Sequence, residues 1–311
     1  MDIIDFIKYS NNLDNKKKLL EQINASKYNI NLFNDYTFGI EFEFELINQD
    51  KLKYLNYPNI LNNWVVKDEQ CNEEVLEISS PILNYDSYSL KEVKLICDII
   101  TNKMLGYISD ECGCHIHIGF DVFKNAMELK NLYTIYCNNE NIFYLMSNKS
   151  NSEMRRNVKY YANPMSVKIE NYINNGYFDN ENDLYNFVQK MKIIQKDRFN
   201  SINIFNAFSI IKNTIEFRCP NGELDYNEIL LNIILYLKLI DASKKGISSD
   251  EINFFISDEV NEESKKDVLL NLLFEDNSQL IELFNDRYET NYEANQKVNR
   301  LIRYKSKVLF K

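Results

Sequence analysis

The chain is poor in the residues that interrupt, cross-link or ligate, since its 311 residues include only seven Gly, four Pro, six Cys, one Trp and two His. No phosphate-binding loop of the GxxxxGK(S/T) or GxGxxG type is present, which argues against P-loop NTPases and protein kinases. Six cysteines without CxxC pairs are too sparse for a disulfide scaffold or structural zinc sites, so we expect reduced thiols. Any site that uses imidazole has only two candidates.

Long apolar runs are also missing. The two most apolar windows, residues 229–240 and 93–105, contain charged or polar residues and fall short of the about 18 apolar residues that a membrane span needs. The N-terminus carries Asp2 and Asp5 where a secretory signal would be basic. Asp and Glu (46) outnumber Lys and Arg (36), giving a net charge of −10, which disfavours nucleic acid and anionic membranes as partners. We therefore expect a cytoplasmic protein that binds neither; the oligomeric state stays open.

Hydrophobic periodicity indicates an α+β protein with a helical C-terminal part. Alternation predicts strands and helical spacing predicts helices: strands over 37–47, 64–69, 74–80, 112–120, 200–211 and 213–219, and helices over 87–104, 124–147, 182–196 and 226–242. The stretches 48–63 and 148–182 are expected to be loops that set substrate specificity. We predict an N-terminal helical segment over 1–30, a catalytic domain over 31–245 and a helical extension over 246–311. The basic end of the extension is expected to form an amphipathic helix packed on the body, with a partner-binding tail as the alternative.

Several predicted strands combine an apolar face with a face rich in ionisable residues, because successive side chains of a strand point to opposite sides. The ionisable faces carry Glu41, Glu43 and Glu45 on the first strand, Glu77 on the third, His115 and His117 on the fourth, and Glu216 and Arg218 on the last. A half-solvated sheet would explain one such strand. Three neighbouring carboxylates without an intervening lysine cost free energy unless cations lie beside them. Carboxylate-rich ligation with one nitrogen donor suits Mg²⁺ or Mn²⁺.

A zinc site is the alternative that the sequence suggests at first sight. Cys112, Cys114, His115 and His117 form a compact Cys/His set. On a strand, however, the thiols and the imidazoles point to opposite faces. The alternation therefore disfavours this quartet, unless the segment is a loop.

Four segments in order resemble a known family: FGIEFEFE (38–45), DEQCNEEVLEISSPIL (68–83), CGCHIHIG (112–119) and TIEFRCPNGELD (214–225). Together they resemble the amidoligases of the glutamine synthetase and glutamate–cysteine ligase superfamily, over roughly residues 36–242. The resemblance implies a curved antiparallel sheet with helices on its convex face, and ATP with two or more Mg²⁺ or Mn²⁺ ions on its concave face. It also implies that ATP phosphorylates a small-molecule or peptide carboxylate, which an amine then attacks to give an amide.

The resemblance also assigns residues. Glu41 and Glu43 resemble ligands of two different metals; His115 and Glu216 complete one site, and Glu77 with Asp68, or its neighbour Glu69, belongs to the other. Relatives commonly read Asp-Gly-Ser where this chain reads Asp68-Glu69-Gln70, so the second metal site departs from the pattern.

The remaining assignments concern the transferred phosphoryl group. Arg218 resembles the arginine that meets it, and Arg218 and Arg198 are expected to stabilise the transition state. His117 is expected to support the metal ligands or the acyl-phosphate oxygen. Arg198 and Arg156, or its neighbour Arg155, are further candidates to bind phosphate or the substrate carboxylate, because a guanidinium grips either with two hydrogen bonds. The alternative for these three is a surface ion pair. Two rival functions remain, a catalytically silent binding module and a metal-dependent hydrolase that uses the same Glu and His residues.

Overall fold

A computed structural model describes residues 35–48, 63–68, 75–275, 277–302, 305 and 307–310. The predicted N-terminal helical segment at 1–30, most of the 48–63 stretch, Glu69 and the side chain of Asp68 lie outside the described residues. The division of the chain into three segments stays a prediction.

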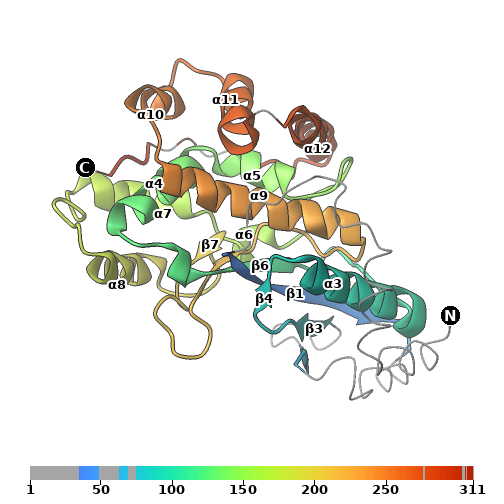
Figure 1. The fold of residues 1–311 in the computed structure, drawn as a ribbon. Helices are drawn as coiled ribbons and strands as arrows, with labels where there is room; N and C mark the ends of the chain where they lie inside the picture. Colours follow the sequence, from blue (N-terminus) through green and yellow to red (C-terminus); the bar gives the residue numbers. More distant parts are fainter. Residues whose placement is uncertain are drawn as a thin grey trace.

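The described part has an α+β architecture around one open antiparallel sheet (Figure 1). The strands are β1 (Thr37–Leu46), β2 (Val65–Asp68), β3 (Val75–Ser79), β4 (Leu83–Asn84), β5 (Gly106–Tyr107), β6 (Cys114–Gly119), β7 (Ile202–Asn203) and β8 (Thr214–Phe217). They follow the order β2-β3-β1-β6-β8-β7, and β4 and β5 both pair with β1. The predicted alternation is confirmed, and β1 lies at the centre of the sheet.

The helices are α3 (Ser87–Ile99), α4 (Ala126–Asn138), α5 (Glu140–Met146), α6 (Val158–Tyr161), α7 (Met165–Asn174), α8 (Leu184–Gln195), α9 (Tyr226–Lys245), α10 (Ser249–Ile256), α11 (Glu262–Phe274) and α12 (Ser278–Lys297), with short helical turns at Ile100–Met104 and Phe120–Val122. Helices α3 and α9 lie over one face of the sheet (Figure 1). That face is the apolar one: Phe42 and Phe44 are buried, and the Phe217 ring stacks on Tyr236 of α9 with centroids 4.1 Å apart. Of the helices that the structure describes, none is both long and apolar enough to span a bilayer.

The loop predicted over 148–182 is wrong in part, because it contains α6 and α7. Helix α7 begins after Pro164, which supplies no side-chain cap. Instead the buried carboxylate of Glu140, at the start of α5, accepts hydrogen bonds from the backbone N–H groups of Met165 (2.8 Å) and Ser166 (2.9 Å). A carboxylate at a helix N-terminus satisfies otherwise unpaired N–H groups and complements the helix dipole. This cap comes from another helix, so local sequence signals do not reveal it.

Two other predicted elements are shorter than expected. The helix over 124–147 divides at Asn139, whose backbone leaves the helical region (φ −125°, ψ 19°). The strand over 200–211 ends at Asn203, because side chains capture the next backbone donors: Gln195 Oε1 accepts from Ile204 and Asn203 Oδ1 accepts from Phe205. Such side-chain acceptors compete with a strand ladder.

The C-terminal part is helical through α12, but the predicted terminal helix is wrong. The described residues that follow Lys297 contain no helix; Asn299 takes a left-handed backbone conformation (φ 53°), which is typical of a helix end. The tail does pack on the body as expected. Val308 is buried, and its N–H and carbonyl both pair with the Asn138 side chain.

Candidate functional site

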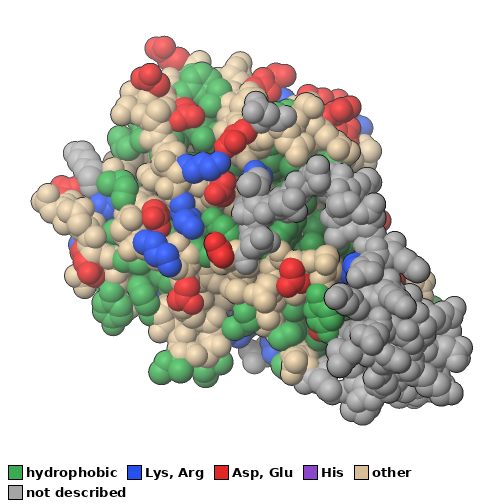
Figure 2. Space-filling model, viewed as in Figure 1, with side chains coloured by type: hydrophobic (Ala, Val, Ile, Leu, Met, Phe, Trp, Pro, Cys, Tyr) green, Lys and Arg blue, Asp and Glu red, His purple; other side chains and the backbone are tan. Residues whose placement is uncertain are grey.

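The polar face of the sheet gathers the predicted ligands. Strand register pairs Glu41 with His115, Glu43 with Glu77, and His117 with Glu216. All six side chains are buried, and no histidine is visible among the mixed acidic and basic side chains on the described part of the face in Figure 2. The alternation of β1, β3, β6 and β8 therefore predicted this face correctly.

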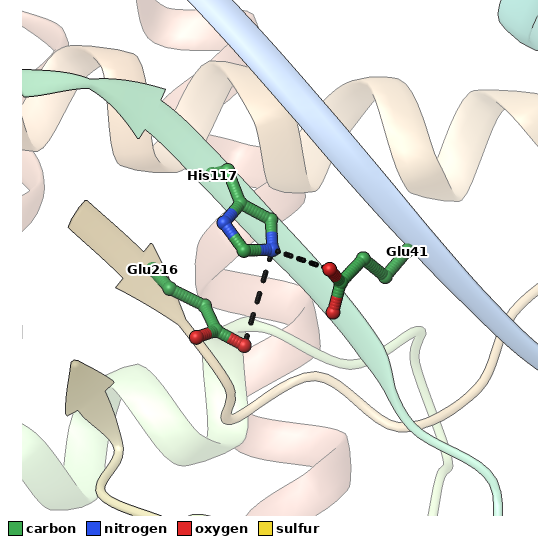
Figure 3. Close-up of side chains that lie close together, drawn as sticks. All are labelled: Glu41, His117 and Glu216. Atoms are coloured by element: carbon green, nitrogen blue, oxygen red, sulfur yellow. Dashed lines mark ion pairs between the residues drawn. The ribbon is translucent and has the colours of Figure 1, made fainter. Parts of the chain in front are cut away.

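Three of these residues converge on one point (Figure 3). Glu41 from β1, His117 from β6 and Glu216 from β8 each offer one ligand atom, and these atoms lie within 4.8 Å of one another. His117 Nε2 lies within ion-pair distance of Glu41 Oε1 (3.3 Å) and Glu216 Oε1 (3.9 Å), but no described residue forms a well-aligned hydrogen bond with it. Its Nδ1 lies 3.3 Å from Thr214 Oγ1. A buried imidazole held through one nitrogen, with the other facing two carboxylates, fits a divalent cation.

His115 occupies the neighbouring position, between the two carboxylates of β1. Its Nδ1 is 3.1 Å from Glu41 Oε2 and 3.5 Å from Glu216 Oε1. Its Nε2 is 3.3 Å from Glu43 Oε1 without a hydrogen bond in the described part of the chain. The resemblance assigned the ligand role to His115 and a supporting role to His117. The geometry brings both imidazoles close to Glu41 and Glu216, and the individual roles of the two stay predictions.

The pKa shifts keep this cluster charged. Burial disfavours ionisation, but His117 and His115 outweigh it and hold the pKa of Glu41 well below its usual range. Burial likewise opposes Arg218 and His117 at Glu216, and these partners lower the pKa of Glu216 to about 2. Despite burial, Glu41 and Glu216 raise the pKa of His117. Both carboxylates are therefore ionised at neutral pH, which is the form that binds cations.

A second acidic position lies around Glu43 and Glu77. Glu43 Oε2 accepts a 2.5 Å hydrogen bond from the N–H of Gly113. Glu77 accepts from Ser79 Oγ (2.5 Å) and forms an ion pair with Lys67. Register pairs Glu77 with Lys67, whereas Asp68 is paired with Leu76. The roles of Glu77, Asp68 and Glu69 as ligands of a second metal stay predictions.

The structure places the candidate arginines in different environments. Arg218 is buried, pairs with Glu216, and donates from Nε to the carbonyl of Tyr161 (2.9 Å). Arg198 is exposed, and its guanidinium and that of Arg218 lie 5.2 Å and 5.8 Å from the centre of the Phe199 ring. Arg198 and Arg218 therefore share a contact with the Phe199 ring, and the role of Arg198 stays a prediction.

Arg155 and Arg156 are adjacent in sequence but separate in space. Arg156 is 65% exposed and forms a 3.0 Å ion pair with Asp110, the surface arrangement that was its alternative. Arg155 is buried; its Nη1 lies 3.7 Å from Glu43 Oε2, and its Nη2 donates to the carbonyl of Arg218 (2.9 Å). The structure thus brings Arg155 to the site and leaves Arg156 outside it.

Gly113 makes room for Arg155. A Cβ at this position would lie 2.0 Å from Arg155 Nη1 and 3.1 Å from Glu43 Oε2. We expect Gly113→Ala to displace the guanidinium and lower the free energy of unfolding by about 1–3 kcal/mol, measured by urea denaturation. Gly39→Ala is the matched control, since its nearest contact is at 3.4 Å. Equal losses in the two variants would contradict this explanation.

Sequence reasoning missed two residues of the site. Asn203 Nδ2 donates to Glu216 Oε2 (2.6 Å), and the two residues are paired in register. Parity on β7 could have identified Asn203. Lys212 lies 3.3 Å from Glu41 Oε1 through its Nζ. It belongs to an irregular segment, where no periodicity gives a signal.

The zinc quartet does not form. Cys114 packs on the apolar face, and the described residues that could hold a metal together include no cysteine. Burial raises the pKa of both Cys114 and Cys112, so neither thiol favours the thiolate form that binds zinc.

Comparison with known proteins agrees with this site. A family model described as "Putative amidoligase enzyme" matches residues 62–240, which is more than half of the chain. No curated protein matches the chain. The matched range includes β3, β6 and β8, which carry Glu77, both histidines and Glu216. Because the match covers more than half of the chain, the chain belongs to this amidoligase family.

Proposed function

We propose that the protein is an ATP-dependent carboxylate–amine ligase with a glutamine synthetase-like sheet, acting with Mg²⁺ or Mn²⁺. The observation that carries the proposal is the buried Nε2 of His117, which faces Glu41 and Glu216 without a hydrogen bond to any residue described. In an amidoligase, this donor set suits a divalent cation that accompanies nucleotide phosphates.

Two groups of residues would hold metal. Glu41, His117 and Glu216 form the first group. Glu43 and His115 Nε2 form the second group. Bound divalent cations would neutralise and polarise the phosphates of ATP.

The proposed reaction needs no covalent intermediate with the enzyme. The terminal phosphoryl group passes from ATP to the substrate carboxylate and releases ADP. The amine then attacks the acyl carbon, expels phosphate and loses a proton to give the amide. Arg218, fixed by Glu216 and Tyr161, is suited to stabilise charge on the transferred group, and exposed Arg198 to bind the nucleotide or substrate carboxylate.

The direct test is an assay of ADP and phosphate release with panels of carboxylates and amines, including amino acids, short peptides and polyamines. The proposal expects release that needs both substrates, and thermal stabilisation by Mg²⁺ with ATP. Hydrolytic activity without nucleotide would establish the metal-dependent hydrolase instead. If the protein shows neither turnover nor nucleotide-dependent stabilisation, the silent binding module would be favoured.

Lys212 gives a separate prediction for metal binding. Its ammonium lies beside Glu41 Oε1, the same oxygen that faces His117, and its side chain is 48% exposed. Since this cation opposes a bound metal, Lys212→Met should tighten Mn²⁺ binding by about two- to fivefold, as expected for a half-exposed ion pair. Isothermal titration calorimetry would measure the change. Lys149→Met is the control, because Lys149 pairs with Glu223; weaker Mn²⁺ binding in Lys212→Met would contradict the prediction.

A further inference from the structure

We propose that helix α12 is a positioning element of the active site, which fixes the segment 150–156 so that Arg155 reaches Glu43. Helix α12 spans Ser278–Lys297 and lies beyond the range 62–240 that the family model matches. It packs beside α5, away from the sheet (Figure 1). The inference rests on the proposed role of Glu43 as a metal ligand.

Two buried asparagines of α12 bind the backbone of this segment. Asn295 Oδ1 accepts from the N–H of Met154 (2.8 Å), and its Nδ2 donates to the carbonyl of Ser152 (3.0 Å). Asn291 Oδ1 accepts from the N–H of Ser152 (2.7 Å), and its Nδ2 donates to the carbonyl of Leu145 (2.9 Å). Four residues apart, the two amides share one face of the helix. Each therefore uses both its donor and its acceptor to hold backbone.

We call the contacts of Asn291 and Asn295 with this backbone the clamp, and two further contacts extend it on either side. Asn151 donates from its N–H to Thr290 Oγ1 (3.1 Å), and Arg300 donates from Nη1 to the carbonyl of Met154 (3.0 Å). The residues from 151 to 155 form no helix or strand of their own. Side chains from the C-terminal part of the chain thus supply hydrogen bonds that the backbone of a helix or strand would supply elsewhere.

The clamped segment leads directly to the site. Arg155 follows Met154, and its own N–H donates to Asn221 Oδ1 (2.9 Å). Its guanidinium then reaches the carbonyl of Arg218 and lies 3.7 Å from Glu43 Oε2, in the space left by Gly113. A shift of Met154 is transmitted to the guanidinium because the two residues are covalent neighbours. The position of Arg155 therefore depends on Asn291 and Asn295.

This arrangement predicts an effect that simple destabilisation would not produce. Arg155 places a positive charge beside a proposed metal ligand, so withdrawing it should make metal binding tighter. We expect Asn295→Ala and Arg155→Met each to raise Mn²⁺ affinity by about two- to tenfold, and the double variant to equal Arg155→Met alone, because both changes act through one group. A structural defect alone would leave Mn²⁺ affinity unchanged or lower it.

The experiment uses the full chain, with Mn²⁺ titrations of wild type, Asn295→Ala, Arg155→Met and the double variant. Hydrogen exchange at the Met154 amide reports its hydrogen bond to Asn295 and should accelerate in Asn295→Ala. Tyr288→Phe is the control on the same helix, because Tyr288 donates to Glu262 and not to the clamped segment. If Asn295→Ala does not fold, Arg300→Met tests the same backbone from a more exposed position.

Unchanged or weaker Mn²⁺ binding in Asn295→Ala, or additive effects in the double variant, would overturn the inference while leaving the proposed ligase function intact. Unchanged exchange at the Met154 amide in Asn295→Ala would overturn it as well. A wild-type protein that binds no Mn²⁺ would remove the proposed function and this inference together.

Discussion

The Glu216→Gln variant is expected to lose nucleotide-dependent turnover by about a thousandfold, the scale seen when a group that stabilises transition-state charge is removed. Glu216 Oε1 faces His117 Nε2 and pairs with Arg218, while Oε2 accepts from Asn203. The amide keeps the shape of the side chain but removes the negative charge that would bind a cation. Steady-state ADP release measures turnover, and Mn²⁺ titration should show a parallel loss of affinity.

Glu45→Gln provides the matched control for this prediction. Glu45 shares the face of β1 with Glu41 and Glu43, but its Oε2 accepts a 2.6 Å hydrogen bond from the hydroxyl of Tyr107. It is not part of the group that converges on His117. We expect Glu45→Gln to retain turnover and Mn²⁺ binding. Retained turnover in Glu216→Gln would remove Glu216 from the catalytic machinery.

The polar face of the sheet was predictable because strand alternation is a local property. Glu41, Glu43, His115, His117 and Glu216 could be assigned to one face from parity alone, and the structure confirms that face. The grouping within the face depends on register and side-chain reach, which parity does not contain. His115 is the residue opposite Glu41 and His117 the residue opposite Glu216, yet both imidazoles lie within 4 Å of both carboxylates.

The parts that could not be predicted depend on contacts between distant segments. Nothing local distinguishes Arg155 from Arg156; their difference arises because Gly113 leaves space for one guanidinium. Helix α7 begins where Glu140 of α5 supplies its cap. Lys212 approaches Glu41 from a segment without periodicity. Each case combines residues that are far apart in the sequence, so a single sequence gives no signal for the pairing.

Part of the excess of acidic residues lies in the site, where each carboxylate has a cationic side chain beside it. The site carboxylates are already accompanied by cations of the chain, namely Lys67 at Glu77, Arg155 at Glu43, Lys212 at Glu41 and Arg218 at Glu216. Two of these, Lys67 and Lys212, have partly exposed side chains, whereas both arginines are buried. If divalent cations bind as proposed, they would displace the partly exposed lysine ammonium groups more readily than the buried arginines.

Arg218→Met tests that division of roles, because turnover and metal binding should change in opposite directions. Loss of the guanidinium removes the group proposed to stabilise the transferred phosphoryl, and we expect turnover to fall by about a hundred- to a thousandfold. The same change removes positive charge beside Glu216, so Mn²⁺ affinity should stay equal or increase. ADP release and Mn²⁺ titration measure the two effects.

Removing one partner of a buried ion pair also lowers stability, by about 3–5 kcal/mol, so Arg218→Lys accompanies the first variant. In the wild type, Arg218 donates from Nε to the Tyr161 carbonyl while its Nη1 pairs with Glu216. Lysine keeps the charge near Glu216, but its single nitrogen cannot reproduce this two-atom geometry. It should fold, bind Mn²⁺ like the wild type and still turn over slowly. If Arg218→Met instead lost Mn²⁺ binding and Arg218→Lys restored full turnover, Arg218 would act only as a counter-charge for Glu216, and the phosphoryl group would need another partner.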